Sequence, residues 1–221
     1  MGNFLFQDGQ KVVFIGDSIT DCGRRGDQAP FGNGYVKFAI DLITARYPER
    51  HITYFNEGIG GNTVLDLHNR WNSDVIAHKP DWVTVKIGIN DLHRTLGTHP
   101  YPSKEGTQAL PPEKYEQLYR EILQLTCEQT QARLVLIDPF YVSTETDTNA
   151  QQGRVLSMLT GYLDVVEKLA KEFDALHVYT HAKFQRQLRH RPPSHFCPEP
   201  VHPYPTGHTI IALALLEVLE W

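Results

Sequence analysis

The fold of this chain is decided by the stretch Lys11-Val12-Val13-Phe14-Ile15-Gly16-Asp17-Ser18-Ile19-Thr20. Its first half is a mostly apolar run, which is typical of a strand buried on both faces of a parallel sheet. Its second half is a Gly-Asp-Ser turn, and open α/β sheets bind ligands where such turns follow the carboxyl ends of strands. Ser18 is therefore a candidate nucleophile, although a plain turn explains this segment equally well when it is taken alone.

Outward from this stretch, strand-like and helix-like segments alternate. Strands separated by helices of about ten or more residues form βαβ units. The sequence therefore predicts an α/β fold, a three-layer α/β/α sandwich around a five-stranded parallel sheet, in one domain over residues 1–221. The predicted strands are Lys11–Ile15, Ile52–Phe55, Trp82–Ile87, Arg133–Ile137 and His177–Tyr179, and the predicted helices are Tyr35–Tyr47, Thr63–Ser73, Glu113–Thr130, Gln151–Phe173 and Thr206–Leu219.

Composition narrows the class of protein. The 221 residues are 41% hydrophobic and carry a formal net charge of −5, without the basic excess of a nucleic-acid-binding protein. No apolar run reaches the roughly 18 residues of a membrane span. Residues 1–8 lack the basic start and apolar core of a signal peptide. We therefore expect a cytoplasmic protein with no nucleic-acid or membrane partner.

Two segments carry groups that could stabilise an oxyanion, which requires hydrogen-bond donors fixed in position. Gly61 follows the second predicted strand and offers a backbone N–H, and Asn90 follows the third and offers a side-chain amide. The alternatives are a glycine-rich turn in which Asn62 or Thr63 caps the next helix, and an Asx turn at Asn90. Asp91 is expected to accept hydrogen bonds from loop N–H groups rather than to react.

His202 is the candidate general base. It stands just before the last predicted helix, and Pro203 fixes the chain at the helix entry. An imidazole with an unperturbed pKa of about 6.5 suits proton transfer near neutral pH. Glu199, three residues earlier, could orient it. The alternatives are a surface histidine and a solvated glutamate between two prolines. The histidines and cysteines show no metal-binding spacing, so no metal is expected.

Together these segments match a known family. Gly16-Asp17-Ser18, Gly58 through Thr63, Gly88-Ile89-Asn90-Asp91 and His202-Pro203 are, in order, the four sequence blocks of the SGNH, or GDSL-type, serine hydrolases. The chain resembles this family nearly end to end. Its Gly-Asp-Ser-Ile-Thr-Asp-Cys-Gly opening and the stretches Arg70-Trp71 and Lys79-Pro80-Asp81-Trp82 are similar to bacterial acetylxylan esterases of the family.

The resemblance implies a role for each block and no cofactor. It makes Ser18 the nucleophile and His202 the base, with the N–H groups of Ser18 and Gly61 and the amide of Asn90 forming the oxyanion hole. The family places an aspartate three residues before this histidine, whereas this chain has Glu199, the one clear departure. The longer glutamate must fit a space usually filled by aspartate, and a water or backbone carbonyl could orient the histidine instead.

The resemblance implies a serine esterase that hydrolyses short-chain esters through an acyl-enzyme. An acetylated carbohydrate such as xylan or xylo-oligosaccharide is the expected substrate. Relatives often assemble into homo-oligomers, so that state remains open here. Aromatic rings at the edge of the site could stack on sugar faces. The candidate substrate-binding residues are Asp17, Trp71, Tyr101 and Phe196, with His93 and Tyr204 as further aromatic candidates.

Three other functions compete with this interpretation. A thioesterase or lysophospholipase would keep the fold and act on longer acyl chains, so activity as a function of acyl length separates it. A weakly active or non-catalytic carbohydrate-binding relative would have Glu199 as the mark of a decayed triad. A nucleotide-binding α/β protein would need a phosphate loop such as GxGxxG or GxxxxGK after the first strand, and neither occurs there.

Overall fold

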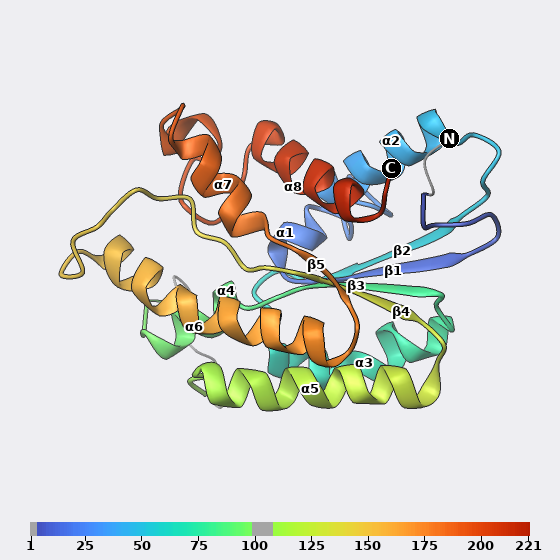
Figure 1. Cartoon of the computed structure of the whole chain (residues 1–221), viewed down its shortest axis with the longest axis horizontal. Helices are drawn as coiled ribbons and strands as arrows, with labels where there is room; N and C mark the ends of the chain where they lie inside the picture. The colour runs from blue at the N-terminus through green and yellow to red at the C-terminus, as the bar shows by residue number, and fades with distance from the viewer. Residues whose placement is uncertain (1–3, 99–107) are drawn as a thin grey trace.

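The computed structural model of the chain describes residues 4–98 and 108–221. Within these ranges its centre is a sheet of five strands in the order β2-β1-β3-β4-β5, and every neighbouring pair is parallel (Figure 1). The predicted α/β fold class is therefore confirmed. The strands are β1 (Lys11–Gly16), β2 (Thr53–Gly58), β3 (Trp82–Lys86), β4 (Arg133–Ile137) and β5 (Leu176–Val178).

Helices cover both faces of the sheet. In Figure 1, α2, α7 and α8 lie on one side and α3, α5 and α6 on the other. Contacts join α2 to α8 and α7 to α8 in the first layer, and α3 to α5 and α5 to α6 in the second. The helices are α1 (Ser18–Asp21), α2 (Tyr35–Arg46), α3 (Val64–Asp74), α4 (Ile89–Thr95), α5 (Pro112–Gln129), α6 (Gln151–Glu172), α7 (Thr180–Leu188) and α8 (Pro205–Val218), with 3-10 turns at Ile76–His78 and Pro193–His195.

The central strands explain the apolar runs in the sequence. Residues Val12–Gly16 of β1 and all five residues of β3 are buried, because helices cover both faces of these strands. The buried apolar side chains form one cluster that runs from Phe4 to Leu219. Each large side chain buried in this way contributes about 1.5–3 kcal/mol to stability.

Local signals at the helix ends act as the sequence predicts. Thr63 caps α3: its hydroxyl accepts from the N–H of Asp66 at 3.4 Å, and the Asp66 carboxylate accepts from the N–H of Thr63 at 2.7 Å. Pro112 and Pro205 occupy the first positions of α5 and α8, where a missing N–H costs nothing. Each of the five predicted helices begins and ends within one residue of its prediction.

The structure adds short elements that the sequence pattern did not indicate. α1, α4 and α7 lie outside the five predicted helices. β2 continues to Gly58, three residues beyond its predicted end. It is an edge strand with one neighbour, so the exposed Thr53 and the partly buried Glu57 cost little there. Among the described helices, none is both long and apolar enough to cross a membrane.

Candidate functional site

The site forms where the carboxyl ends of β1, β2 and β3 lie side by side. In the register of the sheet, Gly16 pairs with Gly58 on one side and with Lys86 on the other. The segments that follow these strands are therefore neighbours, although they are far apart in sequence. The N–H of Ile59 donates to the carbonyl of Gly16 at 3.0 Å, and the amide Nδ2 of Asn90 donates to the carbonyl of Asn62 at 2.9 Å.

Ser18 is the first residue of α1. Asp17 is the cap of this helix, and its carboxylate Oδ1 accepts from the N–H of Ile19 at 3.0 Å. The serine side chain is only partly buried, and its Oγ lies 2.8 Å from Nε2 of His202. The structure thus brings together two residues that are 184 positions apart, in the geometry that a base needs to accept a hydroxyl proton.

Glu199 completes the chain of hydrogen bonds. Its Oε1 lies 2.5 Å from Nδ1 of His202 and also accepts from the backbone N–H of His202 at 2.7 Å. Its Oε2 accepts from the N–H of Val201 at 2.8 Å. Partial burial alone would raise the pKa of Glu199, but these hydrogen bonds outweigh it and hold the pKa below its ordinary value. The carboxylate is therefore ionised when it faces the imidazole.

The segment that carries Glu199 and His202 is anchored by its backbone. The N–H of Val142, in the loop after β4, donates to the carbonyl of Pro200 at 2.9 Å. The N–H of Tyr204 donates to the carbonyl of Phe196 at 2.7 Å. Prolines restrict φ along the segment. They are Pro198, Pro200, Pro203 and Pro205.

Of the two predicted donors other than Ser18, Asn90 lines the same cavity as Glu199 and His202, and Gly61 lies in the turn after β2. Gly61 has a φ of +81°, a conformation that glycine adopts without strain, and a Cβ built there would meet no atom within 4 Å. Glycine is thus required by the backbone and not by crowding. One N–H of the Asn90 amide is held by the carbonyl of Asn62, which orients the whole amide group.

Asp91 is fully buried, and its Oδ1 accepts from the N–H of Val64 at 2.9 Å. Its expected role as a structural acceptor is confirmed. Burial raises the pKa of this carboxyl to about 7, against the opposing effect of the hydrogen bond from Val64. The carboxyl is thus partly protonated near neutral pH, directly beside Asn90.

This raised pKa links stability to pH. A carboxyl whose pKa is higher in the folded than in the unfolded chain stabilises the fold fully below the unfolded value of about 3.9, and that contribution is lost as pH rises through about 7. We expect the free energy of unfolding of wild type to fall by about 2 kcal/mol more than that of Asp91→Asn between pH 5 and pH 8. Asparagine keeps an acceptor for Val64 but does not ionise.

Urea unfolding at several pH values measures this difference. Asp164→Asn, on an exposed position of α6, is the matched control and should follow wild type. Parallel pH curves for wild type and Asp91→Asn would contradict the expectation.

A cavity of about 390 Å³ opens beside the histidine. Its lining joins α4, the loop after β4, the start of α6 and the segment that carries Glu199 and His202. Tyr141 and Gln151 belong to it and were missed in the sequence, although Tyr141 follows the carboxyl end of β4 by only four residues. The lining residues are Asn90, His93, Thr98, Tyr141, Gln151, Glu199, Val201 and His202.

The structure contradicts three of the predicted substrate-binding residues. Trp71 is fully buried between α3 and α5, and its indole N–H donates to the hydroxyl of Thr126 at 2.9 Å. Phe196 is 4% exposed and packs edge-on against Phe184. Asp17 is fully buried beneath the serine. None of the three offers a surface to a ligand, because each is enclosed by the protein core.

The remaining aromatic candidates are Tyr101, His93 and Tyr204, and the two within the described residues differ in their position relative to the cavity. Tyr101 lies outside the described residues. Among the aromatic candidates within the described residues, His93 lines the cavity beside His202 and is placed to meet a ligand there. Tyr204 is 43% exposed but is not among the lining residues.

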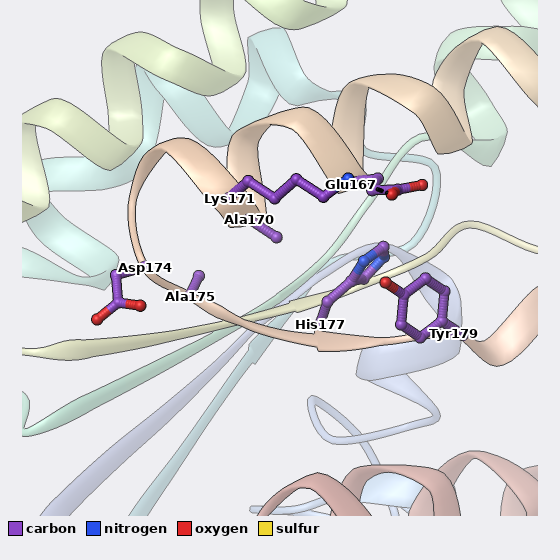
Figure 2. A pocket seen from close by; sticks show the side chains of 7 residues that line it. All are labelled: Glu167, Ala170, Lys171, Asp174, Ala175, His177 and Tyr179. Carbon is purple, nitrogen blue, oxygen red and sulfur yellow. Dashed lines mark hydrogen bonds and ion pairs between the residues drawn. The ribbon is translucent and has the colours of Figure 1, made fainter.

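A second cavity of about 290 Å³ lies away from these residues, along β5 and the end of α6. Figure 2 shows the side chain of Lys171 extending along α6 toward Glu167, and Tyr179 beside His177. None of the predicted site residues lines it. Within the described ranges, no three His, Cys, Asp or Glu side chains are grouped as metal ligands would be.

Comparison with known proteins identifies the family. Residues 14–210 match the model of the GDSL-like Lipase/Acylhydrolase family. An acetylxylan esterase from Geobacillus stearothermophilus is 38% identical over 220 residues, which cover 96% of this chain and 96% of that protein.

Solved structures agree with the sequence comparison. The crystal structure of Axe2, an acetylxylan esterase from G. stearothermophilus, superposes with a TM-score of 0.84 at 36% identity, covering 98% of this chain and 97% of that one. LAE5, an alpha/beta hydrolase from the metagenome of Lake Arreo, Spain, gives 0.84 at 32% identity over 98% of both chains. The predicted family and enzyme class are therefore confirmed: the chain belongs to the GDSL-like lipase/acylhydrolase family and is a carboxylic ester hydrolase.

Proposed function

We propose that this chain is a serine esterase that removes acetyl groups from acetylated carbohydrate such as xylan or xylo-oligosaccharides. The observation that carries the proposal is the chain of hydrogen bonds from Ser18 through His202 to Glu199, which ends beside an open cavity of about 390 Å³. The substrate class is supported by the matches from G. stearothermophilus, which cover the chain nearly end to end: an acetylxylan esterase and a mutant of Axe2 described as an acetyl-xylooligosaccharide esterase.

The first half of the reaction forms an acyl-enzyme. His202 accepts the proton of the Ser18 hydroxyl through Nε2 as Oγ attacks the acetyl carbonyl. The imidazolium that results is stabilised by the ionised Glu199 at its Nδ1. His202 then gives the proton to the departing sugar hydroxyl, and in the second half it activates a water that releases acetate and restores Ser18.

Three donors are proposed to hold the oxyanion of the tetrahedral intermediates. They are the backbone N–H groups of Ser18 and Gly61 and the second N–H of the Asn90 amide. Asn90 is held by the carbonyl of Asn62, so the amide needs no reorientation when charge develops. Donors fixed in this way contribute more to the rate than mobile ones.

The relatives support Glu199 as the acid of the triad. Structures of Axe2 include catalytic mutants in which a serine, an aspartate and a histidine three residues after the aspartate are each replaced by alanine. Glu199 and His202 have the same spacing in this chain. The glutamate reaches the histidine because its longer side chain turns back over the segment and accepts from the N–H groups of Val201 and His202.

Acyl length tests the substrate class. We expect p-nitrophenyl acetate to be hydrolysed at least about tenfold more efficiently than the octanoate ester, because several extra methylenes must find apolar surface, each worth about 0.8 kcal/mol when buried. The polar side chains of Asn90, His93 and Gln151 are among those that line the cavity, and their polar groups offer the extra methylenes no apolar contact. Chromatography of the acetate released from acetylated xylo-oligosaccharides tests whether the chain acts on this class of sugar.

The outcomes separate the competing functions. A preference for octanoate would replace the proposal with a lysophospholipase or thioesterase. No turnover on either ester, with retained binding of xylo-oligosaccharides, would indicate a carbohydrate-binding relative. Self-association and a cytoplasmic location stay predictions, and light scattering of the purified chain tests the first.

A further inference from the structure

We propose that Lys86 is a positioning residue for the ester hydrolysis: its ammonium balances the Asp17 carboxylate, so that this carboxylate can fix the nucleophile segment without opposing the oxyanion. This inference rests on the proposed function, because it assigns Lys86 a task in the reaction of Ser18.

The geometry isolates this pair from solvent. Lys86 is the last residue of β3, and its side chain and that of Asp17 both have 0% exposure. The Nζ atom lies 3.3 Å from Oδ2 and 3.5 Å from Oδ1 of Asp17. It also lies 5.0 Å from the centre of the Phe140 ring, whose face attracts a cation. Leaving either charge unpaired in such a place is costly.

The hydrogen bonds that Asp17 accepts explain why a charged side chain is kept at this position. Its Oδ1 accepts from the N–H of Ile19, and its carbonyl accepts from the N–H groups of Thr20 and Asp21. Asp17 and Ile19 flank Ser18, so the carboxylate fixes the backbone on both sides of the nucleophile. A charged acceptor binds an N–H about twice as strongly as a neutral one.

The negative charge of the same carboxylate disfavours the reaction. In the tetrahedral intermediate, negative charge develops on the substrate oxygen next to Ser18. A fixed negative charge one residue away opposes it, and the low dielectric of the core strengthens the repulsion. Within the described residues, Lys86 is the cation that forms a salt bridge with Asp17. The pair is neutral as a unit, so the oxyanion meets the fixed donors without a net opposing charge.

Other titratable groups around the pair do not replace Lys86. His208 of α8 is kept neutral because burial, and then the charge of Lys86, lower its pKa to about 4. Arg70 of α3 donates to the carbonyl of Gly16 at 3.2 Å, but its Nη1 lies 2.6 Å from Oδ2 of Asp74 and is paired there. The remaining groups are anionic, neutral or exposed. They are Tyr35 of α2, Asp21 of α1, Cys22 after it, Asp91 of α4 and His202 of the loop before α8.

Removing the lysine should slow the chemical step and leave substrate binding unchanged. In Lys86→Met the buried Asp17 carboxylate loses its cation, and its uncompensated charge opposes the oxyanion. We expect kcat on p-nitrophenyl acetate to fall about tenfold, less than the loss of a direct oxyanion donor, with KM little changed.

A double variant isolates the charge. Asp17→Asn combined with Lys86→Met keeps an acceptor for the N–H of Ile19 and contains neither charge. It should recover most of the lost kcat. Val85→Ala, at the neighbouring buried position of β3, is the matched control: it weakens the core but should keep the wild-type kcat.

Several outcomes would overturn the proposal. A wild-type kcat in Lys86→Met would do so, as would a double variant no more active than the single one. If Lys86→Met does not fold, Asp17→Asn serves in its place. It leaves no negative charge beside Ser18, so it should keep most of the wild-type kcat, and a loss of about tenfold or more would contradict the proposal.

Chemical unfolding separates this inference from the proposed function. If wild type hydrolysed no ester, the proposed function would fail. The charge balance would still be tested, because an unpaired buried carboxylate is costly, so Lys86→Met should unfold at a lower urea concentration than the double variant. Equal unfolding midpoints of the two variants would reject the pairing itself.

Discussion

Replacing Ser18 with alanine is expected to lower kcat on p-nitrophenyl acetate by about 10⁵-fold or more, because it removes the attacking atom. Loss of the serine in a well-studied serine protease costs about 10⁶-fold. The fold should not change: the recorded hydrogen bond of the Ser18 hydroxyl is with His202, and the helix cap is supplied by Asp17. Circular dichroism and urea unfolding should therefore match wild type.

The comparison needs a serine that does not react. Ser157→Ala, at an exposed position of α6, introduces the same chemical change and should leave both kcat and stability unchanged. If Ser18→Ala kept more than about one per cent of wild-type kcat, the nucleophile would have to be sought elsewhere in the chain.

Replacing Glu199 with glutamine is expected to lower kcat by about 10⁴-fold, as the equivalent change does in one studied triad. The amide has nearly the shape of the carboxylate but cannot stabilise an imidazolium, and its NH₂ group favours the wrong tautomer of His202. KM should change little, because the loss arises in the transition state. Glu199→Asp should retain more activity than the glutamine variant, since it keeps the charge. The shorter side chain places that charge farther from Nδ1 of His202 than the 2.5 Å of Glu199 Oε1 in wild type.

Glu145 offers a close control. It is an exposed loop glutamate whose Oε1 also accepts from two backbone N–H groups, those of Thr146 and Asp147, so Glu145→Gln tests the loss of such a carboxylate outside the site. It should leave kcat unchanged. Activity of Glu199→Gln within about tenfold of wild type would show that a water or a backbone group, and not this carboxylate, orients the histidine.

The fold could be predicted because its signals are local. Buried parallel strands are continuous apolar runs, as in Val12–Ile15, and prolines mark the start of α5 and α8. The residues of the proposed oxyanion hole could be predicted for a related reason. Ser18, Gly61 and Asn90 follow three strands, and parallel strands bring their carboxyl ends to one edge.

The sequence was a poorer guide to which side chains around the site are buried. Trp71 shares a helical face with Val64 and Leu67, and that spacing already indicated the core, yet its ring chemistry suggested a sugar platform. Phe196 stands in a proline-rich segment with no periodicity to show which way it points. Lys86 is the last residue of a buried strand. Its buried charge is explained by its partner Asp17, which is 69 residues away in sequence and so could not be identified before the fold was known.

The hydrogen bonds within the segment before α8 have a mechanical consequence. Glu199 and His202 are joined to each other through side chain and backbone, whereas Ser18 belongs to the sheet. A rigid displacement of this segment would move Glu199 and His202 together and change the 2.8 Å distance between Ser18 Oγ and His202 Nε2. In the proposed mechanism, sequence changes in the surrounding loops would therefore alter the separation of serine and histidine and leave the hydrogen bond between histidine and glutamate intact.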